Sequence, residues 1–479
     1  MKFFLKYLLI LLAIGLLLIL YFLKTDIGHQ NLGYFIEDYL STETCNKIKV
    51  HSLNLENYPY IVIELKVNDR AKITLKGNIS NYDINMSYHL RGDSFYFNNL
   101  HLDNKLDIHG NLFGAFDSLK VDGDGELFDG KVNYKFINTP KTIKKLTLKM
   151  HKVNSKKLLT FLGEKPLVKG LADVDVKFKS FSYYSKYGKI KVSMEKASID
   201  KVIIEKVKEL PFALNLIMNF NNTDYKYEGN ITSNTIGTLL INRGTYNRGR
   251  RIFYADYKLH LKDLEYLKKI VEHQYKGVLN IDGNLTYNSY KKYFIIKGNS
   301  KEFKGNIDFT YTKDSIDFKL KKVSLEHLLK KLSYPVIFTS DIDGIIDVNL
   351  KEKIVIINTH LKNTRFLRSN FTDTLQNRAR IDVLSSVYNK STFSAGYENN
   401  KISLSLNIAN SNGSIRLRQT KIDLEKNIVN SNFQIKMQGQ EYFGKIYGSL
   451  DNPKFKIDKR KFMRFQTEKY LSDWLRTKE

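Results

Sequence analysis

Cysteine and proline are scarce in this sequence of 479 residues. Cys45 is the single cysteine, which excludes an internal disulfide framework, a thiolate zinc site and a CxxC redox pair. Only six prolines occur, so Pro-rich linkers are excluded too. Long helical patterns alternating with strands are also absent, which argues against a doubly wound α/β enzyme.

Catalytic motifs are missing as well. The ten histidines form no HExxH pattern, and neither a G-x-S-x-G elbow nor a Walker loop occurs. The segments 173–175 and 341–343 have the D-x-D spacing of some glycosyltransferases, but both lie in alternating stretches where every second residue faces water. We therefore expect no enzyme, no catalytic residue, no cofactor and no metal site.

Positive charge and apolar residues are plentiful. Lys and Arg number 77 against 50 Asp and Glu, which gives a net charge of +27. The content of 42% hydrophobic and 13% aromatic residues excludes a disordered chain. The net charge by itself is typical of nucleic-acid binders. However, the excess is spread as single lysines along the strands, with local concentration only at the two ends, so we expect no nucleic-acid partner.

The first 24 residues predict a membrane anchor. Between Lys6 and Lys24 lie 17 uninterrupted apolar or aromatic residues. At a rise of 1.5 Å per residue they would form roughly 26 Å of helix, near the lower limit for a bilayer span. A cleaved signal peptide is the alternative, but no small-x-small site follows the apolar stretch. Lys2 and Lys6 favour a cytoplasmic N-terminus and a single-pass topology, with the rest of the chain outside the cytoplasm.

After a linker (residues 25–46) with a short helix expected at 34–40, residues 47–458 keep a period of two. Apolar side chains alternate with polar ones, which is typical of antiparallel strands with one apolar and one wet face. The fold class is therefore mainly β, with roughly 25 to 30 strands. The residues that we expect on the apolar face include Ile61, Ile63, Leu65, Val174, Val176, Phe178, Ile316, Phe318, Ile346, Val348, Leu404 and Ile435.

Two longer regularities recur along this region. Gly-Asn-Ile or Gly-Asn-Leu occurs at Gly77, Gly110, Gly229, Gly283 and Gly305. Such a glycine indicates a bulge, a bend, a close backbone approach or a hairpin turn. In addition, residues 153–176, 261–283 and 323–348 each predict a polar cap, a helix of one or two turns and then a strand. Repeated units of this kind favour an elongated array.

A long sheet can remove its apolar face from water in two ways. It can curl into an open groove, whose fitting partner on a membrane-anchored protein is a phospholipid acyl chain. Alternatively it can close into a sandwich or stack, in which the apolar face is ordinary core. The alternation alone leaves both open.

The C-terminal segment 459–479 departs from the strand pattern. Lys459, Arg460, Lys461 and Trp474 belong to a predicted basic amphipathic helix. Such a helix binds anionic membrane surfaces, or it caps the open end of a repeat array.

These features together resemble the AsmA-like family. The resemblance is carried by the N-terminal anchor, the three helix-then-strand units, the repeated Gly-Asn strands and the tail Gly448-Ser-Leu-Asp-Asn-Pro453-Lys. It covers most of the chain and rests on architecture more than on invariant residues. It implies an inner (cytoplasmic) membrane anchor, a repeating β-groove in the periplasm (47–458) and phospholipid transport toward the outer membrane. The alternative function is a periplasmic scaffold that assists envelope protein assembly without moving lipid.

Overall fold

The fold is taken from a computed structural model. It describes residues 21–44, 46–80, 82–97, 100–102, 104–182, 185–199, 211–268, 274–334, 336–369, 372–373, 375–376, 382–437, 440–450 and 453–458. The expected anchor (1–24) lies almost entirely outside these residues, and so does the expected C-terminal helix (459–479) with Lys459, Arg460, Lys461 and Trp474.

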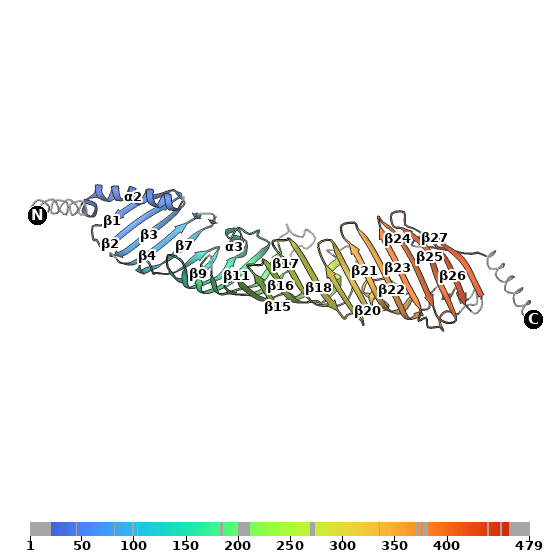
Figure 1. Ribbon diagram of the computed structural model, residues 1–479. Helices are drawn as coiled ribbons and strands as arrows, with labels where there is room; N and C mark the ends of the chain where they lie inside the picture. The colour runs from blue at the N-terminus through green and yellow to red at the C-terminus, as the bar shows by residue number, and fades with distance from the viewer. Residues whose placement is uncertain are drawn as a thin grey trace, which may run out of the picture. The chain divides into compact units, whose positions relative to one another are not determined.

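The fold is mainly β, as the sequence predicts. Twenty-six strands belong to one antiparallel sheet, and β5 (Phe95–Phe97) and β6 (Leu100–Leu102) form a separate two-stranded sheet. Consecutive strands lie side by side (Figure 1). The chain divides into two compact units, of which unit 1 comprises residues 1–234 and 244–250 and unit 2 comprises 235–243 and 251–479.

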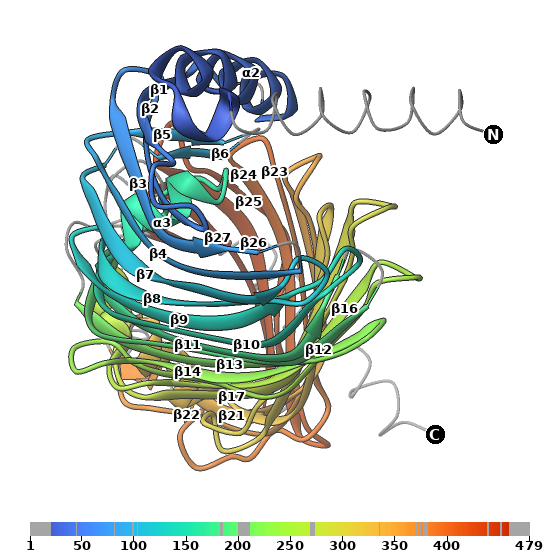
Figure 2. The same cartoon turned by 90° about the vertical axis from the view of Figure 1, so that its left-hand side faces the viewer.

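Unit 1 holds the first twelve strands of the large sheet. They are β1 (Ile48–Asn54), β2 (Tyr60–Val67), β3 (Ala71–Ile79), β4 (Asp83–Gly92), β7 (Leu106–Ala115), β8 (Leu119–Leu127), β9 (Gly130–Asn138), β10 (Ile143–Asn154), β11 (Val168–Phe181), β12 (Lys186–Ile199), β13 (Phe212–Asn221) and β14 (Asp224–Ser233). These strands curve along their length, with helix α3 (Ser155–Phe161) on the inner side of the curve (Figure 2).

Unit 2 holds the later strands, and β15 (Gly237–Asn247) contributes residues to both units. The strands of unit 2 are β16 (Ile252–Leu261), β17 (Leu279–Asn288), β18 (Tyr293–Ser300), β19 (Asn306–Tyr311), β20 (Ser315–Ser324), β21 (Phe338–Asn349), β22 (Ile354–Phe366), β23 (Ser391–Glu398), β24 (Lys401–Ala409), β25 (Gly413–Asp423), β26 (Ile428–Met437), β27 (Gln440–Ser449) and β28 (Lys454–Ile457).

The sheet is not closed into a barrel or a sandwich. Among the described strands, β1 pairs only with β2, and β28 pairs only with β27. The one other sheet in the described residues is the small β5–β6 pair. The closed sandwich that the alternation left open is therefore wrong for this part of the chain.

Helix α2 (Asp26–Thr44) protects the edge strand β1. It has 19 residues, where the sequence predicted a short helix at 34–40. The backbone N–H of Ile48 donates to Ser41 Oγ (3.1 Å), and that of Val50 donates to Glu37 Oε1 (2.6 Å). An uncovered edge strand invites pairing with other chains, so these side chains block an aggregation site.

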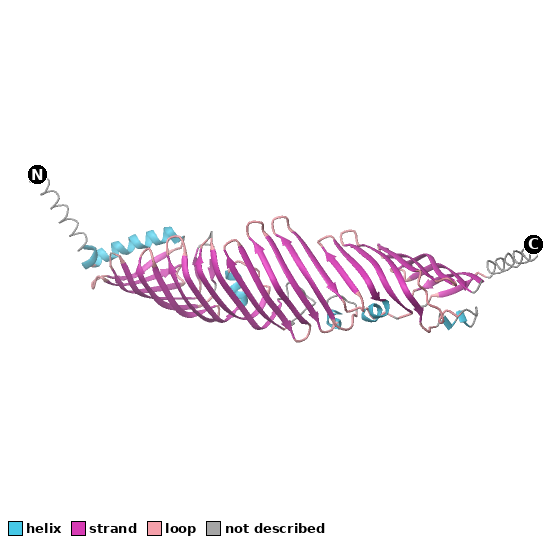
Figure 3. Ribbon diagram, turned by 60° about the horizontal axis from the view of Figure 1, so that its bottom comes forward, coloured by secondary structure: helices cyan, strands magenta, loops and turns pink. Residues whose placement is uncertain are grey.

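The remaining helices are short connections between strands (Figure 3). In unit 1 the connection from β10 to β11 contains α3. In unit 2 the connections from β16 to β17 and from β20 to β21 contain η1 (Leu264–Leu267) and α5 (Leu325–Lys331). Because alternate connections of an antiparallel sheet lie at the same rim, each unit has one rim with long connections and one with short turns. The three predicted helix-then-strand units are confirmed, with Asn154, Asp263 and Ser324 as N-caps.

The D-x-D segments brace irregular backbone. Lys322 has a left-handed φ of 51°, and its N–H donates to Asp343 Oδ1 at 2.9 Å. Lys152 has a φ of 54°, and its N–H donates to Asp173 Oδ1 at 3.0 Å. Both sites precede a capped helix and coincide with a register shift. These carboxylates therefore stabilise two strained bulges by charge-assisted hydrogen bonds.

Candidate functional site: the apolar face of the sheet

Cross-strand pairing places the apolar residues of unit 1 in continuous rows. In each row one residue per strand lies directly opposite its partners on the neighbouring strands. One row consists of Leu53, Ile63, Leu75, Tyr88, Gly110, Gly123, Tyr134, Leu148, Val176, Ile190, Met218 and Tyr227. With roughly 4.8 Å between strands, this row is about 53 Å long.

A second row of unit 1 runs beside the first. It consists of Val50, Leu65, Ile73, Leu90, Ile108, Gly125, Val132, Met150, Val174, Val192, Leu216 and Gly229. Neither row contains a charged residue, although 27% of the chain is charged. The apolar face is therefore a strip at least two residues wide that crosses twelve strands.

Unit 2 has the same organisation. One of its rows consists of Tyr257, Gly283, Gly298, Phe309, Phe318, Ile346, Ile357, Ala395 and Leu404. Its registers are as regular as those of unit 1, and the row again contains no charge. Each unit therefore presents its own apolar strip.

Much of the strip in unit 1 remains partly accessible. Leu148, Ile190 and Met218 are half-buried, whereas Val176 and Phe178 are buried. Helix α3 packs on this face through Leu158 and Phe161. In the described part of unit 1 no second sheet of comparable size covers the strip. Because α3 lies on the inner side of the curved strands, the apolar face is the concave one (Figure 2).

Glycines in the rows make room for aromatic rings from neighbouring strands. A Cβ on Gly110 would lie 2.7 Å from Tyr88 Oη, and a Cβ on Gly283 would lie 2.7 Å from the Tyr257 ring. The Tyr257 hydroxyl donates to the Lys297 carbonyl, two strands away (3.1 Å). The Gly-Asn repeat at Gly110 and Gly283 thus marks close approach in mid-strand. The hairpin-turn interpretation is wrong at both positions.

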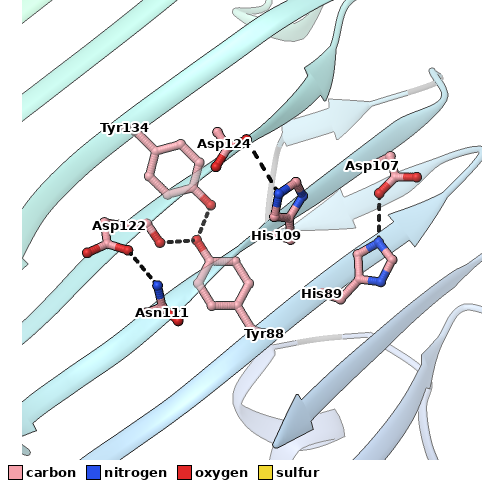
Figure 4. A network of polar contacts seen from close by, with 8 residues as sticks. All are labelled: Tyr88, His89, Asp107, His109, Asn111, Asp122, Asp124 and Tyr134. Carbon is pink, nitrogen blue, oxygen red and sulfur yellow. Dashed lines mark hydrogen bonds and ion pairs between the residues drawn. The ribbon is translucent and has the colours of Figure 1, made fainter.

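The flat tyrosine rings lie over glycines and make this face smooth. Their hydroxyls have hydrogen-bond partners within the protein. The hydroxyls of Tyr88 and Tyr134 point at each other, and Tyr88 also donates to the Asp122 carbonyl at 3.0 Å (Figure 4). Burial raises the pKa of the Tyr88 hydroxyl, so the ring stays neutral. These rings can therefore lie against an apolar ligand without presenting charge.

The opposite face is polar. His89 is hydrogen-bonded to Asp107 (2.6 Å), and His109 Nε2 lies 3.4 Å from Asp124 Oδ2 on the neighbouring strand (Figure 4). The hydrogen bond from His89 lowers the pKa of the Asp107 carboxyl. In the residues that the structure describes, no group of three or more His, Cys, Asp or Glu is placed to hold a metal ion. The arrangement is a solvated ladder of cross-strand pairs.

Part of the apolar face of unit 2 is covered by the chain itself. The described residues of the connection from β22 to β23 (367–369, 372–373, 375–376 and 382–390) are called the strap. Its Val383 and Tyr388 are 1% and 0% exposed. They pack in one cluster with Ile408 and Ile435 of the sheet. Tyr388 also exchanges two backbone hydrogen bonds with Thr364 (2.9 and 3.0 Å).

The candidate residues from the sequence fall into three environments. Val174, Val176, Phe178, Ile61, Ile63, Ile316, Phe318, Ile346, Val348 and Leu404 lie in strands of the two strips. Leu65 belongs to the cluster that includes Leu40 of α2. Ile435 lies in the cluster covered by the strap. The last two are therefore packed by other parts of the described chain. Val174, Val176 and Phe178 also share a cluster with Leu158 and Phe161 of α3, and Phe318 and Ile346 share one with Leu325 and Leu328 of α5.

Sequence reasoning missed three contributors to the face. Tyr134 alternates with polar neighbours between Val132 and Phe136, but neither it nor Tyr88 was among the expected residues of the apolar face. The strap was also missed, because its apolar residues have no strand periodicity. A tyrosine in register with a glycine is the signal that would have found the first two.

The fold and the site define an open antiparallel β-sheet protein with one apolar strip on each unit. No protein-family model, curated protein or solved structure matches the chain. The resemblance to the AsmA-like family therefore stays a prediction. Among the described residues, which begin at Tyr21, no helix is both long and apolar enough to cross a membrane.

Proposed function

We propose that the apolar strips bind phospholipid acyl chains, and that the chain is a membrane-anchored periplasmic protein that moves lipid between the inner and outer membranes. The observation that carries the proposal is the uncharged, half-exposed strip of unit 1. Apolar patches larger than a few hundred Å² are rarely left open on soluble proteins without a ligand or partner. A long, narrow and concave strip fits an extended hydrocarbon chain better than a compact ligand.

The two rims of each unit support lateral entry of a lipid. Helices and long connections crowd one rim, whereas the other has short turns such as Asn222-Thr223 in unit 1. A phospholipid lying in the strip can keep its headgroup in water at the rim of short turns. The anchor and the periplasmic location rest on residues 1–24 and on the family resemblance. The role is binding, with no catalysis.

The test compares two adjacent residues of β13. Leu216 is half-buried in the second row of unit 1, and Asn215 is exposed on the polar face. The full chain, extracted from membranes in mild detergent, is analysed for co-purified phospholipid by mass spectrometry. Leu216→Asp should lose most of the lipid, because a carboxylate in the strip opposes hydrocarbon. Asn215→Asp adds the same charge on the other face and should keep it.

A photo-crosslinking amino acid at each position covers the case in which Leu216→Asp does not fold. Crosslinks to lipid are expected from position 216 and not from 215. Repeated recovery of lipid-free wild-type protein, or equal crosslinking from both faces, would overturn the proposal and leave a scaffolding role.

A further inference from the structure

Lysines concentrate on the polar face between β9 and β12. Residues 130–199 contain 17 Lys and four Asp or Glu, which gives a net charge of +13 out of the total of +27. This corrects the expectation that positive charge is concentrated only at the two ends of the chain. The registers instead place Lys135, Thr147, Lys177 and Lys189 in one cross-strand row.

Two of these lysines face each other directly. Lys177 on β11 is paired with Lys189 on β12, an arrangement of like charges that destabilises a sheet. The adjacent row adds Lys149 and Lys191 on either side of Asp175. Of these five lysines, only Lys177 has a carboxylate within 4 Å in the described structure, namely Asp175 at 3.5 Å. The charge is therefore largely uncompensated by the protein.

A shallow depression of about 450 Å³ lies among these lysines. It is lined by Lys145, Leu146, Thr147, Lys177, Phe178, Lys179, Tyr187, Gly188 and Lys189, and its accessible wall is mostly carbon. Tyr187 is 40% exposed, and the side chain of Lys177 is 61% exposed. Ammonium groups and hydroxyls are the donors that phosphate oxygens accept from. The Thr147 hydroxyl already donates to the Lys135 carbonyl (3.4 Å), so the donors available to an anion are the lysine ammonium groups at the ends of their side chains and the Tyr187 hydroxyl.

We propose that the cross-strand row of Lys135, Lys177 and Lys189 binds a soluble polyphosphorylated anion. A compact ligand with several negative charges relieves the repulsion between Lys177 and Lys189. A membrane surface fits less well, because Tyr187 is the one large apolar side chain among the lining residues that is exposed. The site lies on the face opposite the acyl strip, so it does not depend on the lipid proposal.

The test uses inorganic tripolyphosphate and the full chain. Isothermal titration calorimetry at low salt should show one site in the wild type, and the affinity should fall as salt is added. Lys177→Gln combined with Lys189→Gln should weaken binding by about tenfold or more. The matched control, Lys421→Gln with Lys445→Gln, removes two lysines that line a hollow on the polar face of unit 2 and should change affinity by less than about twofold.

Thermal unfolding gives a second measurement. Tripolyphosphate should raise the Tm of the wild type and of the control, but not that of the Lys177/Lys189 variant, which itself should be as stable as the wild type without ligand. Equal losses in both double variants would mean that only net charge matters. Lysine-dependent binding to vesicles containing phosphatidic acid, without binding of tripolyphosphate, would assign the face to a membrane. Either result would overturn the proposal.

Discussion

Tyr388 is the largest fully buried side chain among the described residues of the strap, and we expect the closure of the strap over unit 2 to depend on it. Its side chain is 0% exposed, and its ring lies edge-on to Phe366 with a centroid separation of 5.8 Å. Replacing a fully buried aromatic residue by alanine typically costs about 3–5 kcal/mol. In the described residues the strap forms one isolated β-bridge with the sheet, and a few further hydrogen bonds such as Lys390 N–H to the Ala409 carbonyl (3.0 Å) hold its end. Because the strap is a connection with so little pairing, we expect the loss of the ring to open it locally.

The size of the effect can be followed by hydrogen exchange. The amides of Tyr388 and Thr364 donate to each other's carbonyls, so both report on closure. A loss of about 3 kcal/mol increases the opening equilibrium by roughly a hundredfold, and exchange of both amides should accelerate to that extent in Tyr388→Ala. Tyr388→Phe keeps the ring and removes a buried hydroxyl that has no hydrogen-bond partner among the described residues, so exchange should be unchanged or slower.

An equal acceleration of hydrogen exchange across unit 2 would refute this reasoning. If Tyr388→Ala accelerates exchange equally in β17 to β20, unit 2 unfolds as a whole and the strap is no separate element. If the alanine and phenylalanine variants behave alike, ring burial does not hold the strap. In the expected case, the full chain carrying Tyr388→Ala should also bind more lipid, since Ile408 and Ile435 become accessible.

Two further predictions concern the sheet itself. The backbone N–H of Lys322 and the ammonium of Lys362 lower the pKa of the Asp343 carboxyl below its ordinary 3.8. The contribution of this carboxylate to stability is therefore present above about pH 4 and is lost as the pH falls through the lowered pKa. Urea unfolding of Asp343→Asn from pH 6 to pH 2 should lack this part of the acid destabilisation, and an unchanged pH profile would contradict the stabilising role of Asp343. Gly283→Ala should lower the free energy of unfolding by more than about 2 kcal/mol, because the added Cβ meets the Lys297 carbonyl and the Tyr257 ring. Gly249→Ala is the control, since a Cβ there meets only the Asn247 side chain at 3.5 Å. It should cost less than about 1 kcal/mol in the same denaturant titration.

The strands were predictable because their signal is local. Ile61, Val176, Ile346 and Ile435 alternate with polar neighbours, and every one of them lies in a strand. The short helices were predictable for the same reason, since Asn154 and Ser324 cap them within a few residues. The meaning of the glycines was not predictable, because the ring that each one accommodates belongs to another strand.

The sequence predicted that the candidate site is an apolar face, but not which residues of that face other parts of the chain cover. Alternation separates an apolar face from a polar one, and this assigned Val174, Phe318 and Leu404 without reference to their neighbours. It does not reveal that Leu65 packs near α2, or that Ile435 lies under Tyr388 of the strap. Those contacts join residues that are tens of positions apart, and no local pattern encodes them.

By itself, the sequence determined that this protein is mainly antiparallel β with one apolar face, because a period of two is imposed by the geometry of a single strand. Only the tertiary structure decided that the sheet stays open, since closure depends on which strands meet. It likewise decided where the charge gathers. Lys177 and Lys189 are single lysines along the chain, and only the register between β11 and β12 places them opposite each other.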